Sequence, residues 1–393
     1  MPDLLIDAGR SLWGWSGIGS FVKCPRMWAL NELSEGRNIM PRGPIPGSAG
    51  DVPPSVHLPT PTPQTQAQMD SAERRDEART WGSMGHCGLA HFYTLSALSQ
   101  DMTVDGSVRV GTNDGIIKVG KDSSGRLYSP AEAATQWCTR NDKGFGSLAE
   151  VVKMLTVYQQ RNRRLQEQVL AVEWPVLAVV GVHPIRGIGL WVLDQDTFRE
   201  PGVGDPLLSV IDQAEIVPWR LDVPGHPRHG LPLYLSRRID LVSYDGRYWI
   251  DDHKCLAHVE PKLARTAYAV DRGNAALRMM GAQIWGQYFG GVRINFVSKR
   301  PKKGTSSFYF TRKEVAVSRA QEWSMAGRLY DAYHERARYQ VQTSRGEREV
   351  MPTTPGSYCW PDAGHDVGAC KHRYGNCDYL EADGDSAVRR CVG

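Results

Sequence analysis

The sequence predicts a mixed α/β fold, because segments with strand character alternate with longer segments of helical character. The strand segments are short, apolar and rich in β-branched and aromatic residues, and one pair is joined by a tight turn. Strands are expected within 169–194, 231–255, 292–297 and 306–312, and helices within 69–100, 147–168, 256–290 and 313–342.

The stretch 231–255, LPLYLSRRIDLVSYDGRYWIDDHKC, predicts a β-hairpin. Strand residues run from Leu235 to Val242 and again from Arg247 to Ile250. The dipeptide Asp245-Gly246 lies between them, and Asp-Gly readily takes the positive φ angles that a tight hairpin turn needs.

Polar residues in this hairpin predict a metal site. Residues two apart in a strand point to the same face, so Asp252 and Lys254 project together, and the hairpin can bring Asp240 beside them. Two carboxylates suit Mg²⁺ or Mn²⁺, and the lysine is a cation for a phosphate group. The alternative is an ordinary hairpin that ends in exposed charges.

Composition indicates a globular protein with a full core. The chain has 393 residues, of which 41% are hydrophobic and 23% charged, with a net charge of +4. This mild basicity permits a nucleic-acid partner without requiring one. No run approaches the roughly 18 apolar residues of a membrane span, and the N-terminus lacks the apolar core of a signal peptide. A cytoplasmic protein without a membrane partner is expected.

The eight cysteines need a separate explanation, because four of them fall within the last 35 residues. In a reducing compartment, clustered cysteines favour metal or iron–sulfur ligation over disulfides. The cysteines are Cys24, Cys87, Cys138, Cys255, Cys359, Cys370, Cys377 and Cys391.

Composition shifts divide the chain into four parts. Residues 41–68 are rich in Pro, Gly, Ser and Thr and predict a linker after an N-terminal segment, 1–40. Residues 69–345 form the predicted core, and 346–393 a cysteine-rich tail that packs with 1–40. Within the core, 101–146 are expected to be irregular and 195–230 to form a surface loop. The helix predicted over 313–342 places Val317, Trp323, Met325, Leu329 and Tyr333 on or near one apolar stripe.

Four motifs occur in a fixed order: F-x-x-C-P-R-x-W at 21–28, G-x-x-x-H at 82–86, R-I-D-L-V…W-I-D-D-H-K at 238–254, and Q-I-W-G-Q-Y at 283–288. With the cysteine-rich tail, this set resembles the PD-(D/E)XK nuclease superfamily. It is most similar to the RecB-like exonucleases, including CRISPR-associated and phage-encoded members with an iron–sulfur cluster. The resemblance spans most of the chain and implies a restriction-endonuclease-like core, in which helices flank a central mixed sheet.

The resemblance implies roles for residues from the first two motifs of this core. His86 matches the histidine that ligates the metal ion, and His91 is a second choice. Asp240 matches the metal-binding aspartate of the first hairpin strand.

The second hairpin strand carries the D-x-K signature of the resemblance. Asp252 matches its acidic metal ligand, and the backbone carbonyl of His253 is a usual further ligand. Lys254 matches the lysine that orients the attacking water and stabilises negative charge. Asp251 is expected to point to the other face and to be non-catalytic.

The glutamine motif of the resemblance assigns Gln283 to the catalytic site as a lining residue. Here Gln283 and Tyr288 are five apart, where the family has a spacing of four. Tyr288 is therefore assigned only to DNA binding.

The tail implies a 4Fe–4S cluster, since four cysteine thiolates meet its ligand requirement. The expected ligands are Cys24, Cys370, Cys377 and Cys391, with Cys359 as a spare. The family places its last three cysteines close together, and here the final one is displaced to Cys391. The alternative is a structural Zn²⁺ site made by Cys359, Cys370, Cys377 and either His365 or His372.

Basic residues are candidates for contacts with a DNA backbone. The alternative for them is a solvated loop. The candidates are Arg26, Lys299, Arg300, Lys302 and Lys303.

The expected function is that of a metal-dependent DNA exonuclease that hydrolyses phosphodiester bonds at single-stranded ends in recombination, repair or phage DNA metabolism. A structure-specific or restriction-like endonuclease is the alternative on the same fold. A non-catalytic DNA-binding iron–sulfur protein is the alternative from another class. The chain lacks a P-loop motif, so no helicase is evident, and the protein is expected to act alone or with a separate recombination or helicase partner.

Overall fold

The structure, a computed structural model, describes residues 66–103, 109–110, 121–194, 215–256, 271–301 and 308–344, together with a few single residues and two residue pairs near the C-terminus. The chain divides into two compact units. The first comprises Met1–Ile6, Glu77–Val217 and Leu235–Ala326, and the second comprises Asp7–Asp76, Pro218–Tyr234 and Gly327–Gly393. The domain boundaries expected from the sequence stay predictions.

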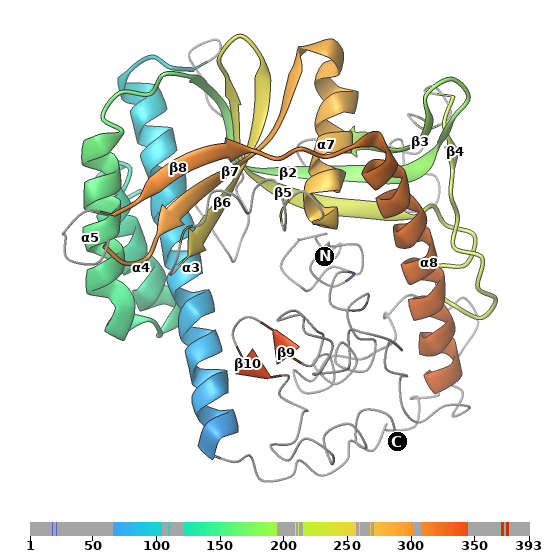
Figure 1. The fold of residues 1–393 in the computed structure, drawn as a ribbon, viewed down its shortest axis with the longest axis horizontal. Coiled ribbons are helices and arrows are strands. Elements are labelled where there is room, and N and C mark those ends of the chain that lie inside the picture. Colours follow the sequence, from blue (N-terminus) through green and yellow to red (C-terminus); the bar gives the residue numbers. More distant parts are fainter. Residues whose placement is uncertain are drawn as a thin grey trace. The chain divides into compact units, whose positions relative to one another are not determined.

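A mixed β-sheet organises the first unit, as the sequence predicts (Figure 1). Its hydrogen-bonded order is β1-β2-β5-β6-β7-β8, and β3 pairs with β2. The pairs β1–β2 and β6–β7 are parallel, whereas β2–β3, β5–β6 and β7–β8 are antiparallel. The strands are β1 (Arg109–Val110), β2 (Gln168–His183), β3 (Gly187–Asp194), β4 (Val217–Pro218), β5 (Tyr234–Tyr244), β6 (Tyr248–Leu256), β7 (Phe289–Ser298) and β8 (Phe310–Glu314).

Helices flank this sheet (Figure 1). Buried side chains of α3, α4 and α5 share one core with Val172 of β2, Leu241 of β5 and Val297 of β7. Helix α7 packs instead against β3, β6 and β7. Among the described helices, none is long and apolar enough to cross a membrane. The helices are α3 (Gln66–Ser99), α4 (Pro130–Asn141), α5 (Phe145–Arg161), α7 (Arg272–Trp285), η2 (Gly286–Tyr288) and α8 (Arg319–Ser344).

The irregular structure predicted for 101–146 is wrong at its second half, where α4 forms. The side chain of Ser129 accepts a hydrogen bond from the N–H of Glu132, and Glu132 bonds back to the N–H of Ser129. Pro130 follows as the first helical residue, where its fixed φ angle is favourable. This capping box was present in the sequence as Ser-Pro-Ala-Glu.

Several predicted boundaries also move. The helix expected over 147–168 ends at Arg161, and the helical region expected over 256–290 gives way to β7 at Phe289. The helix expected over 313–342 begins only at Arg319, because β8 continues to Glu314. Trp323, which the sequence predicts on or near the apolar stripe of that helix, is 50% exposed.

Close packing of α3 against β6 depends on a glycine. A Cβ atom on Gly85 would lie 2.9 Å from the Sγ atom of Cys255, so a larger side chain would push the helix away from the strand. Gly88 makes a similarly close approach to Leu155, while Gly82 faces open space. Gly85 therefore allows α3 to lie close to β6 next to His86.

The second unit contains buried residues where a surface loop was expected. Leu221, Val223 and His226 are almost fully buried, which corrects the surface-loop prediction over its described part, 215–230. The hydroxyl of Tyr333 donates to the carbonyl oxygen of Tyr234 at 2.6 Å, both within this unit. The pairs β9 (Lys371–His372) and β10 (Gly375–Asn376) form a short antiparallel ladder.

His226 makes the stability of the second unit dependent on pH. Its Nδ1 atom accepts from the N–H of Arg228, and its Nε2 atom lies 3.2 Å from Oε1 of Gln340, so the neutral ring satisfies both nitrogens. Burial lowers the pKa of His226 to about 4. Between pH 6.5 and 4, His226 therefore binds a proton in the unfolded chain but not in the folded chain. The free energy of unfolding falls as pH decreases through that window.

We expect this residue to account for up to about 3 kcal/mol of the stability lost by pH 4. Urea denaturation of the wild type and of His226→Gln should give a stability difference that changes between pH 7.5 and pH 4.5. His229→Gln is the matched control, because the His229 side chain is 48% exposed. Parallel pH profiles for the wild type and His226→Gln would contradict the assignment.

Candidate metal and catalytic site

The β5–β6 hairpin is confirmed, and its register places the polar residues. Leu241 pairs with Asp251 and Val242 with Ile250. Continuing this antiparallel register by one residue places Asp240 opposite Asp252. Because side chains alternate between faces, Asp240, Asp252 and Lys254 share one face of the hairpin.

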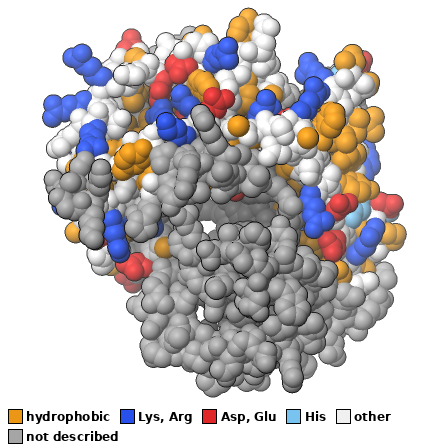
Figure 2. All heavy atoms as spheres, viewed as in Figure 1, with side chains coloured by type: hydrophobic (Ala, Val, Ile, Leu, Met, Phe, Trp, Pro, Cys, Tyr) orange, Lys and Arg blue, Asp and Glu red, His pale blue; other side chains and the backbone are white. Residues whose placement is uncertain are grey.

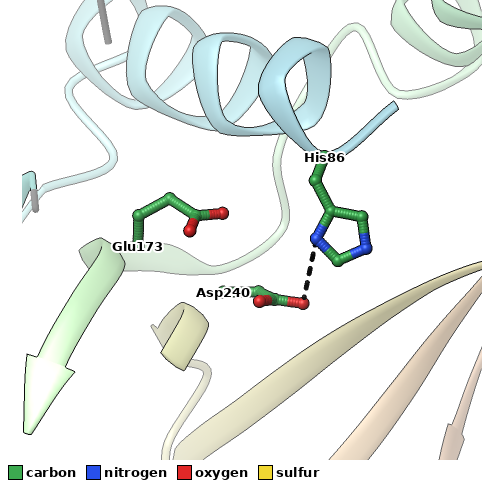
Figure 3. Close-up of side chains that lie close together, drawn as sticks. All are labelled: His86, Glu173 and Asp240. Carbon is green, nitrogen blue, oxygen red and sulfur yellow. Dashed lines mark ion pairs between the residues drawn. The ribbon is translucent and has the colours of Figure 1, made fainter. Parts of the chain in front are cut away.

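Three potential metal ligands converge at this face from three separate elements (Figure 3). They are His86 of α3, Glu173 of β2 and Asp240 of β5, and their ligand atoms all lie within 4.8 Å of one another. The Nδ1 atom of His86 is 3.5 Å from Oδ2 of Asp240. The backbone N–H of His253 donates to the same oxygen at 2.7 Å, which fixes the carboxylate in place.

Glu173 was missed in the sequence, although it carries a signal. It is a lone acidic residue in the apolar run Val169–Val180. Its φ angle of 51° is in the left-handed region, which is uncommon for a residue with a side chain and marks a local irregularity in the strand. Pro175 follows two residues later in β2, which lies between β1 and β5 in the sheet.

The Glu173 carboxylate is buried, and its ion-pair partner is Arg238. It is 1% exposed, and Nε of Arg238 forms an ion pair with it at 2.7 Å. Neither carboxylate oxygen accepts a hydrogen bond of good geometry from the described residues. Burial raises the pKa of Glu173 to about 8, with a further contribution from Asp240 that Arg238 opposes.

Asp240 has the opposite electrostatic environment. Burial alone would raise its pKa, but electrostatic interactions with His86, His253 and Lys254, together with the hydrogen bond from the N–H of His253, outweigh this effect and lower the pKa below its usual range. The group is therefore an anion at neutral pH, as a metal ligand must be.

Asp252 and Lys254 form an ion pair beside this cluster. Their Oδ2 and Nζ atoms are 2.6 Å apart. Burial raises the pKa of Asp252, and Lys254 opposes this shift. Burial would lower the pKa of Lys254, but Asp252 and Asp240 reverse the effect and raise it. Lys254 is therefore a fixed cation, suited to stabilising negative charge and not to accepting a proton.

The donor set fits a divalent cation. One imidazole nitrogen and two carboxylates suit Mn²⁺, and the carboxylates with water suit Mg²⁺. Buried Glu173 supports this fit, because apart from the ion pair with Arg238 its oxygens have no hydrogen-bond partner among the described residues, and an incompletely partnered buried carboxylate is costly. Asp252 is the adjacent carboxylate that could complete the ligand set.

Asp251 and His253 point to the other face of β6, as the alternation requires. The guanidinium of Arg293 donates two hydrogen bonds to Asp251, each of 2.8 Å, and Ser243 donates a third. The ring of His253 is 5.4 Å from that of Tyr93, in a stacked arrangement, and Nδ2 of Asn295 lies 3.1 Å from its Nδ1 atom. These contacts give Asp251 structural partners away from the metal ligands, whereas the ring of His253 also lies 5.9 Å from the ring of His86.

The remaining predicted residues of the core are not among the three clustered ligands. Oε1 of Gln283 accepts a hydrogen bond from the N–H of Val192 in β3. Buried His91 bonds through Nδ1 to the carbonyl oxygen of Cys87 and does not belong to the three-residue cluster. Tyr288 is 60% exposed in η2.

The two described candidates for DNA-backbone contacts, Lys299 and Arg300, differ in their environments. Lys299 donates to the carbonyl oxygen of Ala78 and lies 5.0 Å from the ring centre of Trp81, so it ties the end of β7 to α3. Arg300 is exposed. Figure 2 shows Lys and Arg side chains spread over the described surface, with Asp and Glu among them.

The cysteine-rich site falls outside the described residues. Every predicted cluster cysteine, one of the two alternative zinc histidines and three of the DNA-binding candidates lie outside the described residues. The side chain of the other zinc histidine, His372, is not described either. The predicted residues outside the described part of the chain are Cys24, Cys359, Cys370, Cys377, Cys391, His365, Arg26, Lys302 and Lys303.

Comparison of the chain with protein-family models, with curated proteins and with solved structures finds no match.

Proposed function

We propose that this protein is a metal-dependent deoxyribonuclease with a PD-(D/E)XK-type site, acting as an exonuclease on single-stranded DNA ends. One observation carries the proposal: His86, Glu173 and Asp240 converge from three elements on the hairpin face that carries the Asp252–Lys254 pair. Metal ligands and a fixed cation at one site are what phosphodiester hydrolysis requires.

Each residue of the site has a separate role in the proposed hydrolysis. His86, Glu173 and Asp240 would hold a divalent cation, with Asp252 as the adjacent carboxylate. A bound cation would polarise a phosphoryl oxygen and lower the pKa of a water molecule. Lys254 offsets negative charge at the scissile phosphate. The backbone N–H of His253 and the ring of His86 fix the orientation of Asp240.

The net reaction is a hydrolysis. A water oxygen forms a bond to phosphorus, the bond from phosphorus to the leaving sugar oxygen breaks, and the proton released by the attacking water is balanced by protonation of the leaving oxygen. The products are a phosphate monoester and a free hydroxyl. The iron–sulfur cluster, the zinc alternative and a helicase partner stay predictions.

The test is a cleavage assay with protein freed of metal by EDTA and resupplied with Mg²⁺ or Mn²⁺. Substrates are single- and double-stranded DNA labelled at either the 5′ or the 3′ end, and a circular single strand. We expect metal-dependent degradation of linear single strands and an intact circle. Cleavage of the circle would establish an endonuclease instead. Folded protein that cleaves no substrate with either metal would contradict the proposal.

A further inference from the structure

A second polar site lies in the first unit, in a cavity of about 510 Å³. Its walls come from α3, the end of α5, the turn after α5, β7 and β8. The lining residues are rich in arginine: Arg161, Arg164, Arg293 and Arg312 all face it. The facing carboxylates are Glu167 and Asp245.

The cavity and the Asp252–Lys254 pair lie on opposite faces of β6. In the parallel β6–β7 ladder, Asp251 pairs with Arg293 and His253 with Asn295. Arg293 and Asn295 line the cavity, and they contact the side chains of Asp251 and His253. Asp252 and Lys254 project from the opposite face of the same strand. A ligand here would therefore not occupy the proposed catalytic site.

Two of the four guanidinium groups are held in position by buried acceptors. Arg312 donates to Glu167 and to the hydroxyl of Tyr93. Arg293 donates to both carboxylate oxygens of Asp251, which is fully buried. Partners of this kind fix the planar guanidinium groups in advance, so less conformational entropy is lost when a ligand binds.

The other two arginines come from the end of α5 and the turn that follows. Arg161 donates to the carbonyl oxygen of Phe308 and lies 5.5 Å from the ring centre of Phe310. Arg164 is exposed and has no hydrogen bond or ion pair with the described residues. Four cations thus face Glu167, Asp245 and the buried Asp251, which leaves the walls with an excess of positive charge.

The size and the remaining walls identify the ligand class. The volume lies in the range of small-molecule sites and exceeds what a lone phosphate ion needs. The rings of Tyr158 and Phe310 provide an apolar wall, and Asn162 and Gln166 add side-chain amides. Arginine is the side chain best suited to binding phosphate oxygens.

We propose that this cavity binds a mononucleotide, with its phosphate against Arg164 and Arg312 and its base against the aromatic wall. The same chemistry occurs at the end of a phosphorylated oligonucleotide, so the test includes both forms. This inference does not depend on the proposed nuclease activity.

The test is isothermal titration calorimetry of the full chain with deoxyadenosine 5′-monophosphate in EDTA. We expect a Kd below about 1 mM for the wild type, and binding weakened about tenfold or more in Arg164→Glu. Arg163→Glu is the matched control, because the neighbouring Arg163 is exposed but does not line the cavity. Gln166→Trp, which places a bulky side chain at the cavity wall, should also weaken binding, whereas Lys254→Met should leave it unchanged.

Deoxyadenosine should bind more weakly than the nucleotide, because it lacks the phosphate. Equal effects of Arg163→Glu and Arg164→Glu would overturn the proposal, as would loss of binding in Lys254→Met. Absence of nucleotide binding to folded wild-type protein at several times about 1 mM would overturn it as well. Binding of a 5′-phosphorylated oligonucleotide without binding of the mononucleotide would assign the cavity to a DNA end instead.

Discussion

Replacing Asp240 with asparagine is expected to lower the nuclease activity by about a thousandfold or more. Asp240 is the anionic ligand at the centre of the three-residue cluster. Its Oδ2 atom is 3.5 Å from Nδ1 of His86 and accepts a hydrogen bond from the N–H of His253. An amide of the same size removes the charge that attracts a cation. A metal ion contributes several kcal/mol to stabilising the transition state, which corresponds to about three orders of magnitude in rate.

Two measurements check this result. Titration of EDTA-treated protein with Mn²⁺ should show much weaker binding in Asp240→Asn, and single-turnover cleavage should show the loss of rate. Glu173→Gln should weaken Mn²⁺ binding in the same direction. Asp101→Asn is the control, since Asp101 is exposed and its φ angle of 53° also suits asparagine. Wild-type Mn²⁺ affinity in folded Asp240→Asn would refute the ligand assignment.

Replacing Lys254 with methionine is expected to lower kcat about a hundred- to a thousandfold, as is typical when a group that stabilises developing charge is removed. The Nζ atom of Lys254 is 2.6 Å from Asp252, and the raised pKa of the lysine keeps it charged at neutral pH. Methionine preserves much of the side-chain length without the charge. Mn²⁺ binding by His86, Glu173 and Asp240 should persist.

The contrast between the two variants separates the roles of the residues. Asp240→Asn should lose Mn²⁺ binding and activity together, whereas Lys254→Met should lose activity and keep Mn²⁺ binding. Lys313→Met on β8 is the matched control, because Lys313 is exposed on the same sheet. Cleavage by Lys254→Met at the wild-type rate would contradict the proposed role of Lys254 in stabilising negative charge.

Sequence patterns predicted the hairpin well because its determinants are local. The Asp245-Gly246 turn and the two flanking strands specify which residues pair, and alternation then separates Asp251 from Asp252. The contacts of Asp251 with Arg293 and of Asp252 with Lys254 agree with that separation. Helix α4 had an equally local signal, the Ser129–Glu132 capping box, and it was overlooked.

Glu173 shows where such patterns are insufficient. Glu173 is a candidate metal ligand only because His86 on α3 and Asp240 on β5 lie beside it, and both are far from it in the sequence. Gln283 is a second example. Its side-chain oxygen accepts a hydrogen bond from the N–H of Val192 because α7 packs against β3. Neither contact follows from spacing within one segment.

The sequence by itself determined the mixed α/β character, the hairpin, and the shared face of Asp240, Asp252 and Lys254, because turn chemistry and strand alternation act over a few residues. Only the tertiary structure added Glu173 to His86 and Asp240, and only it assembled the arginine-lined cavity behind β6. The physical reason is that both sites are formed by the packing of distant elements. In that packing, Gly85 allows α3 to approach β6 closely enough for His86 to reach Asp240.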